Sequence, residues 1–155
     1  MTEAKTLGEL KSSGHRVLTV RQEMRKNLIS KLQAKEDAFP NIVGYQDTVI
    51  PQLENAILSG QDVILLGERG QAKSRIIRSL TSLLDEWTPV LEDVEIPENP
   101  YAPISAQGKK ILLEQGDEAA IKWLHRDTRY GEKLATPDIT IADLIGEIDP
   151  IKIAE

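Results

Sequence analysis

The spacing of apolar residues in the first part of the chain predicts two helices. The first begins after Thr19, where apolar side chains recur every four residues, at Val20, Met24, Leu28 and Leu32. Thr19 followed by Gln22 suits a capping box, and we expect the helix to end near Asp37. The second has an apolar face made of Val49, Ile50, Leu53, Ala56 and Ile57. Pro51 is compatible with its first turn, and Gly60 is expected to stop it.

A different pattern follows at Asp62–Leu66, which ends in four consecutive apolar residues. Such a run is typical of a strand buried on both faces of a parallel sheet. After a glycine-bearing loop, a third helix is expected to reach Trp87, with Ile76, Leu80, Leu83, Leu84 and Trp87 on its buried side. The order helix, strand, loop, helix favours an α/β nucleotide-binding fold.

The remaining segments have weaker patterns. Residues 1–14 are mostly polar and predict a loose arm, while residues 88–130 are interrupted by four prolines. Their acidic cluster is interpreted as a solvated loop rather than a metal site, and consists of Glu92, Asp93, Glu95 and Glu98. Three further elements are expected, a short helix from Asp117 through Leu124, a second strand at Lys133–Thr136 and a helix at Ile141–Ile145.

Composition narrows the class of protein. The 155 residues suit about one domain, and the absence of cysteine excludes disulfides and thiolate metal sites. No apolar run has the length of a membrane span and no signal peptide is evident, so a cytoplasmic location is expected. The net charge is −6: residues 1–40 carry +3, and the remaining residues carry −9. This acidic body argues against nucleic acid as the principal partner. The basic segment is interpreted as a solvated helix face, with contact to an acidic partner as the alternative.

The clearest chemical motif is Gly67-Glu68-Arg69-Gly70-Gln71-Ala72-Lys73-Ser74. It fits the phosphate-binding P-loop, in which glycine, four residues, a second glycine, lysine and serine or threonine follow one another, except that Ala72 replaces the second glycine. The spacing allows backbone N–H groups to converge on a phosphate at the start of a helix. Lys73 would reach the β- and γ-phosphates of ATP, and the Ser74 hydroxyl would bind Mg²⁺.

Two positions in and beside this loop need separate expectations. A β-carbon at Ala72 is tolerable if the φ angle of that residue is negative. Arg75 follows the loop and is expected either to touch the α-phosphate or to face solvent from the helix.

His15 and His125 have no second histidine at ligand spacing, which argues against a metal site at either residue.

The motifs together resemble the MoxR and magnesium-chelatase branch of the AAA+ ATPases. The Ala72-Lys73-Ser74 ending is similar to that branch's P-loop, and Thr136–Gly146 is similar to its Thr-Pro-Asp segment. Phe39–Gly44 looks like the AAA+ motif that lines the adenine pocket. By this resemblance Val43 and Gly44 flank adenine, with Tyr45 close by; the alternative for this stretch is a core-packing loop.

The resemblance implies a three-layer P-loop NTPase fold, of which this chain holds an incomplete part. Residues 1–37 form an N-terminal arm and helix, residues 38–155 begin the AAA+ module, and residues 88–130 are interpreted as an insertion. In the implied strand order 5-1-4-3-2, Val63–Leu66 is the first strand. We therefore expect it to lack native sheet partners, to pair with a non-native strand or to pair with another chain.

The family also implies a function. Its members form homo-oligomeric rings, hydrolyse ATP and remodel a partner, often a protein with a von Willebrand A domain, or assist metal insertion. No acidic Walker B strand, sensor residue or arginine finger is recognisable before Glu155, so this chain alone is expected to be inactive and to contain no catalytic residue. Asp143, Glu147 and Asp149 are interpreted as surface residues. The alternative function is a nucleotide- or partner-binding fragment without turnover; a small P-loop kinase and a sigma-factor activator fit less well.

Overall fold

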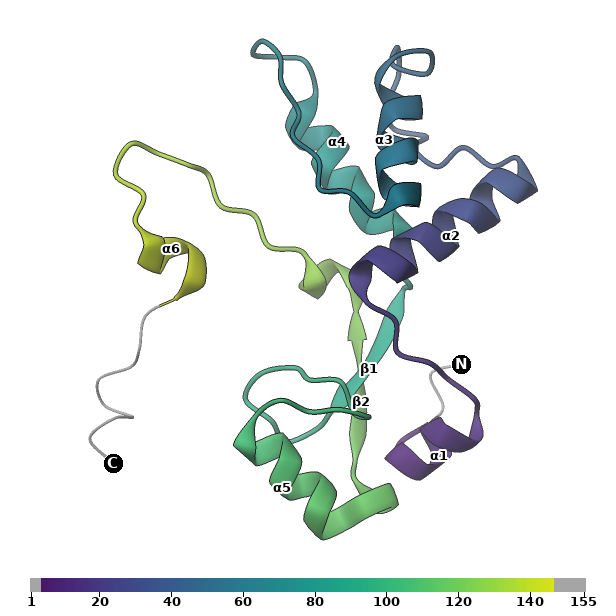
Figure 1. Cartoon of the computed structure of the whole chain (residues 1–155), viewed down its shortest axis with the longest axis vertical. Coiled ribbons are helices and arrows are strands. Elements are labelled where there is room, and N and C mark those ends of the chain that lie inside the picture. The colour runs from purple at the N-terminus through teal and green to yellow at the C-terminus, as the bar shows by residue number, and fades with distance from the viewer. Residues whose placement is uncertain (1–3, 147–155) are drawn as a thin grey trace.

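The computed structural model describes residues 4–146, which form helices and one small antiparallel sheet (Figure 1). The α-helices are α1 (Leu7–Ser12), α2 (Val20–Ala34), α3 (Val49–Ser59), α4 (Lys73–Ser79), α5 (Ala106–Gln115) and α6 (Ile141–Ile145). The strands are β1 (Trp87–Leu91) and β2 (Ile121–His125), and the 3₁₀ helices are η1 (Leu80–Leu83), η2 (Gly116–Glu118) and η3 (Arg126–Arg129). This mixture is compatible with an α/β class.

Helices α2, α3 and α4 form a helical lobe around one hydrophobic cluster. Its buried residues are Leu28, Ala38, Phe39, Ile42, Ile50, Leu53, Ile57, Ile76 and Leu83. Phe39 is only 2% exposed, which gives the loop between α2 and α3 its own anchor in the core. The helical lobe is therefore held by apolar contacts from α2, α3 and α4 together with the loop before α3 and the 3₁₀ helix η1.

Both helices predicted before the loop are confirmed. Thr19 and Gln22 form the expected capping box at the start of α2, and that helix ends at Lys35, whose φ of 57° is left-handed. In α3 the apolar face points inward, and Gly60 ends the helix with a φ of 68°. The predicted helix at Ile141–Ile145 is also confirmed, with its own capping box between Thr140 and Asp143.

The second lobe is built around β1 and β2, an antiparallel pair of strands that we call the β1–β2 hairpin, although residues 92–120 between them contain α5 and η2. The strands pair antiparallel, with Trp87 opposite His125 and Leu91 opposite Ile121. Leu91 and Ala119 are fully buried in a second cluster, which also contains Leu7 and Val94. Helices α1 and α5 lie beside the hairpin in this lobe (Figure 1).

The hairpin corrects two predictions. The third helix does not reach Trp87, because α4 ends at Ser79, η1 ends at Leu83, and Trp87 begins β1. The helix expected from Asp117 through Leu124 is wrong as well, since η2 ends at Glu118 and the second half of that range, from Ile121, is β2. In both cases cross-strand pairing between residues 30 to 38 positions apart overrides the local helical pattern.

Three other expectations are corrected. Residues 7–12 of the supposed loose arm form α1, because Leu7 and Leu10 are buried against the hairpin lobe and Thr6 caps the helix. Glu98 is not part of a solvated loop: it is buried and accepts hydrogen bonds from the N–H groups of Ile104 and Ser105 just before α5. Lys133–Thr136 is not a strand, and it belongs to no sheet among the described residues. Glu147 and Asp149 lie outside the described residues.

The strand predicted at Asp62–Leu66 is wrong as a strand. Its residues lie between α3 and the loop, and no backbone hydrogen bond joins Val63–Leu66 to another residue within 4–146. The sheet in this part of the chain has two strands, β1 and β2, which pair with each other. The expectation that Val63–Leu66 lacks sheet partners is thus confirmed for the described residues.

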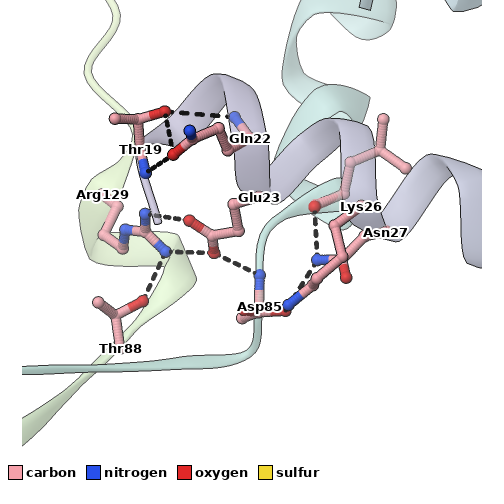
Figure 2. A network of polar contacts seen from close by, with 9 residues as sticks. Thr19, Gln22, Glu23, Lys26, Asn27, Asp85, Thr88 and Arg129 are labelled. Atoms are coloured by element: carbon pink, nitrogen blue, oxygen red, sulfur yellow. Dashed lines mark hydrogen bonds and ion pairs between the residues drawn. The ribbon is translucent and has the colours of Figure 1, made fainter. Parts of the chain in front are cut away.

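A buried ion pair connects the two lobes (Figure 2). The side chain of Glu23 on α2 is 4% exposed and accepts two hydrogen bonds from Arg129 of η3, at 2.7 and 2.6 Å. Arg129 also donates to the Thr88 hydroxyl on β1 at 2.7 Å, and the N–H of Asp85 donates to Glu23 at 2.6 Å. The hydrogen bonds with Glu23 raise the pKa of Arg129, so the guanidinium stays charged.

We predict that Glu23→Ala strongly destabilises the protein. The substitution leaves the Arg129 guanidinium largely buried without its carboxylate, which costs about 3 kcal/mol. Urea unfolding monitored by circular dichroism measures this change. Glu36→Ala is the matched control, because its carboxylate is 63% exposed and lies 3.7 Å from Lys31; that substitution should change stability by less than about 0.5 kcal/mol. Equal effects of the two substitutions would contradict the role of the ion pair.

Candidate functional site

The loop Gly67–Ser74 lies between the extended residues 61–66 and the start of α4 at Lys73. Three of its residues have φ angles in the left-handed half of the map: Gly67 (152°), Gly70 (83°) and Ala72 (54°). These dihedral angles reverse the chain repeatedly within a few residues, which is how a loop turns its backbone N–H groups toward one point. The local conformation therefore fits the expectation from the motif.

Lys73 folds back over the loop. Its Nζ donates hydrogen bonds to the carbonyl oxygens of Gly67, at 2.8 Å, and of Glu68. The side-chain oxygen of Gln71 lies only 2.2 Å from the place where a β-carbon on Gly67 would sit. The φ of 152° favours glycine at position 67, whereas the flexible Gln71 side chain could turn aside from a β-carbon there.

The backbone donors of the loop have no partners. Within residues 4–146, none of the nine N–H groups from Gly67 to Arg75 donates a hydrogen bond. Gly67–Gln71, Ser74 and Arg75 are exposed, and Ala72 and Lys73 are half-buried. Residues 67–75 also carry three cationic side chains against the single carboxylate of Glu68, in a chain whose net charge is −6. Unpaired N–H groups with surplus positive charge form an environment suited to an anion.

Ala72 corrects the expectation about its backbone. Its φ is 54°, in the left-handed region, so the condition of a negative φ is not met. A residue with a β-carbon costs about 1 kcal/mol in this conformation. Ala72 is the N-cap of α4, and its carbonyl accepts a hydrogen bond from the N–H of Ile76 at 2.9 Å.

Tyr45 connects the proposed adenine-binding stretch to the loop. Its hydroxyl donates to the Gln71 carbonyl at 3.3 Å, and its ring packs against the helical cluster. The neighbouring Val43 is 81% exposed, and Gly44 has a φ of 88° and donates its N–H to the Gln46 side chain. The core-packing alternative is correct for Phe39 and Ile42, which are buried, but not for the exposed Val43.

The remaining candidate residues are accessible. Arg69, Ser74 and Arg75 are exposed, and their side chains make no hydrogen bond within the described part of the chain. A serine hydroxyl is a hard oxygen ligand of the type that Mg²⁺ accepts, so Ser74 fits the expected role as one ligand among phosphate oxygens and waters. No group of three or more histidine or acidic side chains within residues 4–146 is arranged to hold a metal by itself.

Comparison of the chain with protein-family models, with curated proteins and with solved structures gave no match. Among the described helices, none has both the length and the apolar character needed to cross a membrane.

We predict that Ala72→Gly stabilises the protein. Glycine removes the left-handed strain of about 1 kcal/mol, and the greater entropy of the unfolded chain cancels part of this gain, leaving about 0.5 kcal/mol. Thermal melts should show a higher midpoint. Ala56→Gly, in the middle of α3, is the control and should lower stability by about 1 kcal/mol. A loss of stability in Ala72→Gly would show that the left-handed conformation is not adopted in solution.

Proposed function

We propose that the chain binds ATP together with Mg²⁺ through Gly67–Ser74. The observation that carries this proposal is the run of nine backbone N–H groups, Gly67 to Arg75, that donate to no described residue. The Lys73 ammonium lies in the same loop, bonded to the Gly67 and Glu68 carbonyl oxygens. A terminal phosphate offers several acceptor oxygens at once, and it is the ligand for which this combination of donors is suited.

Binding requires an exchange of partners at Lys73. Its ammonium would leave the carbonyl oxygens of Gly67 and Glu68 and bond to the β- and γ-phosphate oxygens, which are charged and therefore stronger acceptors. The Ser74 hydroxyl would supply one ligand to Mg²⁺, and Arg75 is near enough in sequence to reach the α-phosphate. Adenine would lie beside Val43 and Gly44, which the hydrogen bond of Tyr45 ties to the loop.

The wider assignment is proposed from the resemblance. It gives a P-loop NTPase fold of the AAA+ type, a homo-oligomeric ring, and ATP hydrolysis that remodels a partner such as a von Willebrand A-domain protein, in the cytoplasm. The alternative is a module that binds nucleotide or a partner without turnover. A phosphate-release assay on this chain separates the two: the alternative predicts no steady release, and sustained release that Lys73→Ala abolishes would exclude it.

We predict that Lys73→Ala weakens ATP binding at least tenfold, or by about 1.4 kcal/mol, because the substitution removes the charge that faces the phosphates. Isothermal titration calorimetry with MgATP measures the affinity. Lys110→Ala is the matched control, since it removes the same charge from an exposed position on α5 and should leave the affinity unchanged. Equal affinity of the wild-type and Lys73→Ala proteins would contradict phosphate binding by the loop.

A further inference from the structure

Helix α4 carries two of the residues proposed to bind nucleotide, Lys73 and Ser74, in its first turn. The helix has seven residues, and no side chain among the described residues caps its first N–H groups. Ile76 is its one buried residue, at 2% exposed. A helix this short depends for its stability on contacts with the rest of the protein rather than on its own hydrogen bonds. The directions in which Lys73 and Ser74 point are therefore set by the contacts that hold α4.

The outward face of α4 is held by one ion pair. Arg78, in the last turn, donates two hydrogen bonds of 2.7 Å to the carboxylate of Glu132. Arg78 follows Ser74 by four residues, so these two side chains lie on one face of the helix, whereas Ile76 lies on the other. Within residues 4–146, no other side-chain hydrogen bond joins α4 to a segment distant in the sequence. The pair therefore holds the face that carries Ser74.

Glu132 is itself fixed in place. The hydroxyl of Tyr130 donates a hydrogen bond of 2.9 Å to its carboxylate. Arg129, three residues before Glu132, forms the buried ion pair with Glu23. The hydrogen bonds from Arg78 and Tyr130 lower the pKa of Glu132 to about 2, so its carboxylate is ionised at neutral pH. This segment thus connects α4 to the junction of the two lobes.

We propose that Glu132 is a positioning residue for the nucleotide site, acting through Arg78. The ion pair fixes the rotation of α4 about its axis, and with it the directions of Lys73 and Ser74. This inference rests on the proposed function, since it gives Glu132 a part in nucleotide binding without contact to the nucleotide. An exposed ion pair usually contributes little to stability, but a bidentate pair of arginine and carboxylate has a defined geometry. Here that geometry acts on a helix with a single buried side chain.

The sign of the effect separates positioning from simple charge. Glu132 is negative, as the phosphates are, so neutralising it would strengthen MgATP binding if electrostatic repulsion were all that changed. If Glu132 positions α4, the same substitution releases the outward face of the helix and weakens binding. The two explanations therefore predict changes of affinity in opposite directions.

Isothermal titration calorimetry with MgATP on the full chain measures this sign. Glu132→Gln keeps the shape of the side chain and should weaken binding about threefold, the size expected for a well-aligned exposed pair. Glu114→Gln is the matched control, because it removes a carboxylate from an exposed pair with Lys110 on α5 and should leave the affinity unchanged. If the wild-type protein binds MgATP and Glu132→Gln binds it equally or more tightly, the proposal is overturned.

A double substitution tests whether Glu132 acts through Arg78. Arg78→Gln breaks the same ion pair, so adding Glu132→Gln to it should weaken binding no further. A double variant that binds MgATP more weakly than Arg78→Gln alone would show that the two residues act independently.

Amide hydrogen exchange without nucleotide tests the hold on α4 separately from ATP binding. Glu132→Gln should speed exchange of the helical amides of α4, because fewer contacts keep that helix closed, and should leave the amides of α5 at the wild-type rate. A wild-type protein that does not bind MgATP contradicts the proposed function, and these exchange rates then still decide whether Glu132 holds α4. Equal exchange of α4 in the two proteins overturns the positioning role.

Discussion

The buried ion pair between Glu23 and Arg129 is the contact on which the arrangement of this protein depends. Apolar packing explains each lobe separately, since one cluster belongs to the helices and the other to the hairpin. Glu23 adds the connection: its carboxylate bonds to Arg129 after β2 and to the N–H of Asp85 before β1 (Figure 2). A charged pair so little exposed is destabilising unless every partner is in place, which gives the lobes one specific relation.

The candidate loop is held in place by contacts of α4, which follows it, and of Tyr45. Helix α4 packs Ile76 into the helical cluster, and Arg78 near its end bonds to Glu132. Tyr45 holds the Gln71 carbonyl from the other side. Before the loop, Leu65 packs against the helical cluster, but the backbone of Val63–Leu66 has no partner among residues 4–146. The start of the loop is therefore less constrained than its end, and it would gain order when a phosphate binds.

The sequence predicted what depends on local periodicity and missed what depends on distant contacts. Helices α2 and α3 were predictable because their caps and apolar faces agree. The β1–β2 hairpin was not, because Trp87 and Trp123 fit helical spacing and only their cross-strand neighbours make them strand residues. Glu98 was interpreted as part of a solvated loop and Glu23 was not singled out, since nothing nearby in sequence shows that the N–H groups before α5 or Arg129 will meet them. In the site, the glycine spacing indicated the turn, but not the left-handed Ala72 or the bond from Tyr45 to Gln71. The phosphate-binding role of Lys73 stays a prediction.

The central claim is that the unpaired N–H groups from Gly67 to Arg75 receive the phosphates of a nucleotide. Amide hydrogen exchange followed by NMR tests it most directly, because it reports on each of these groups individually. Addition of MgATP should slow exchange throughout residues 67–75, while adenosine, which lacks phosphate, should leave these amides unchanged. Unaltered exchange at residues 67–75 with saturating MgATP, or protection confined to other segments, would contradict the account.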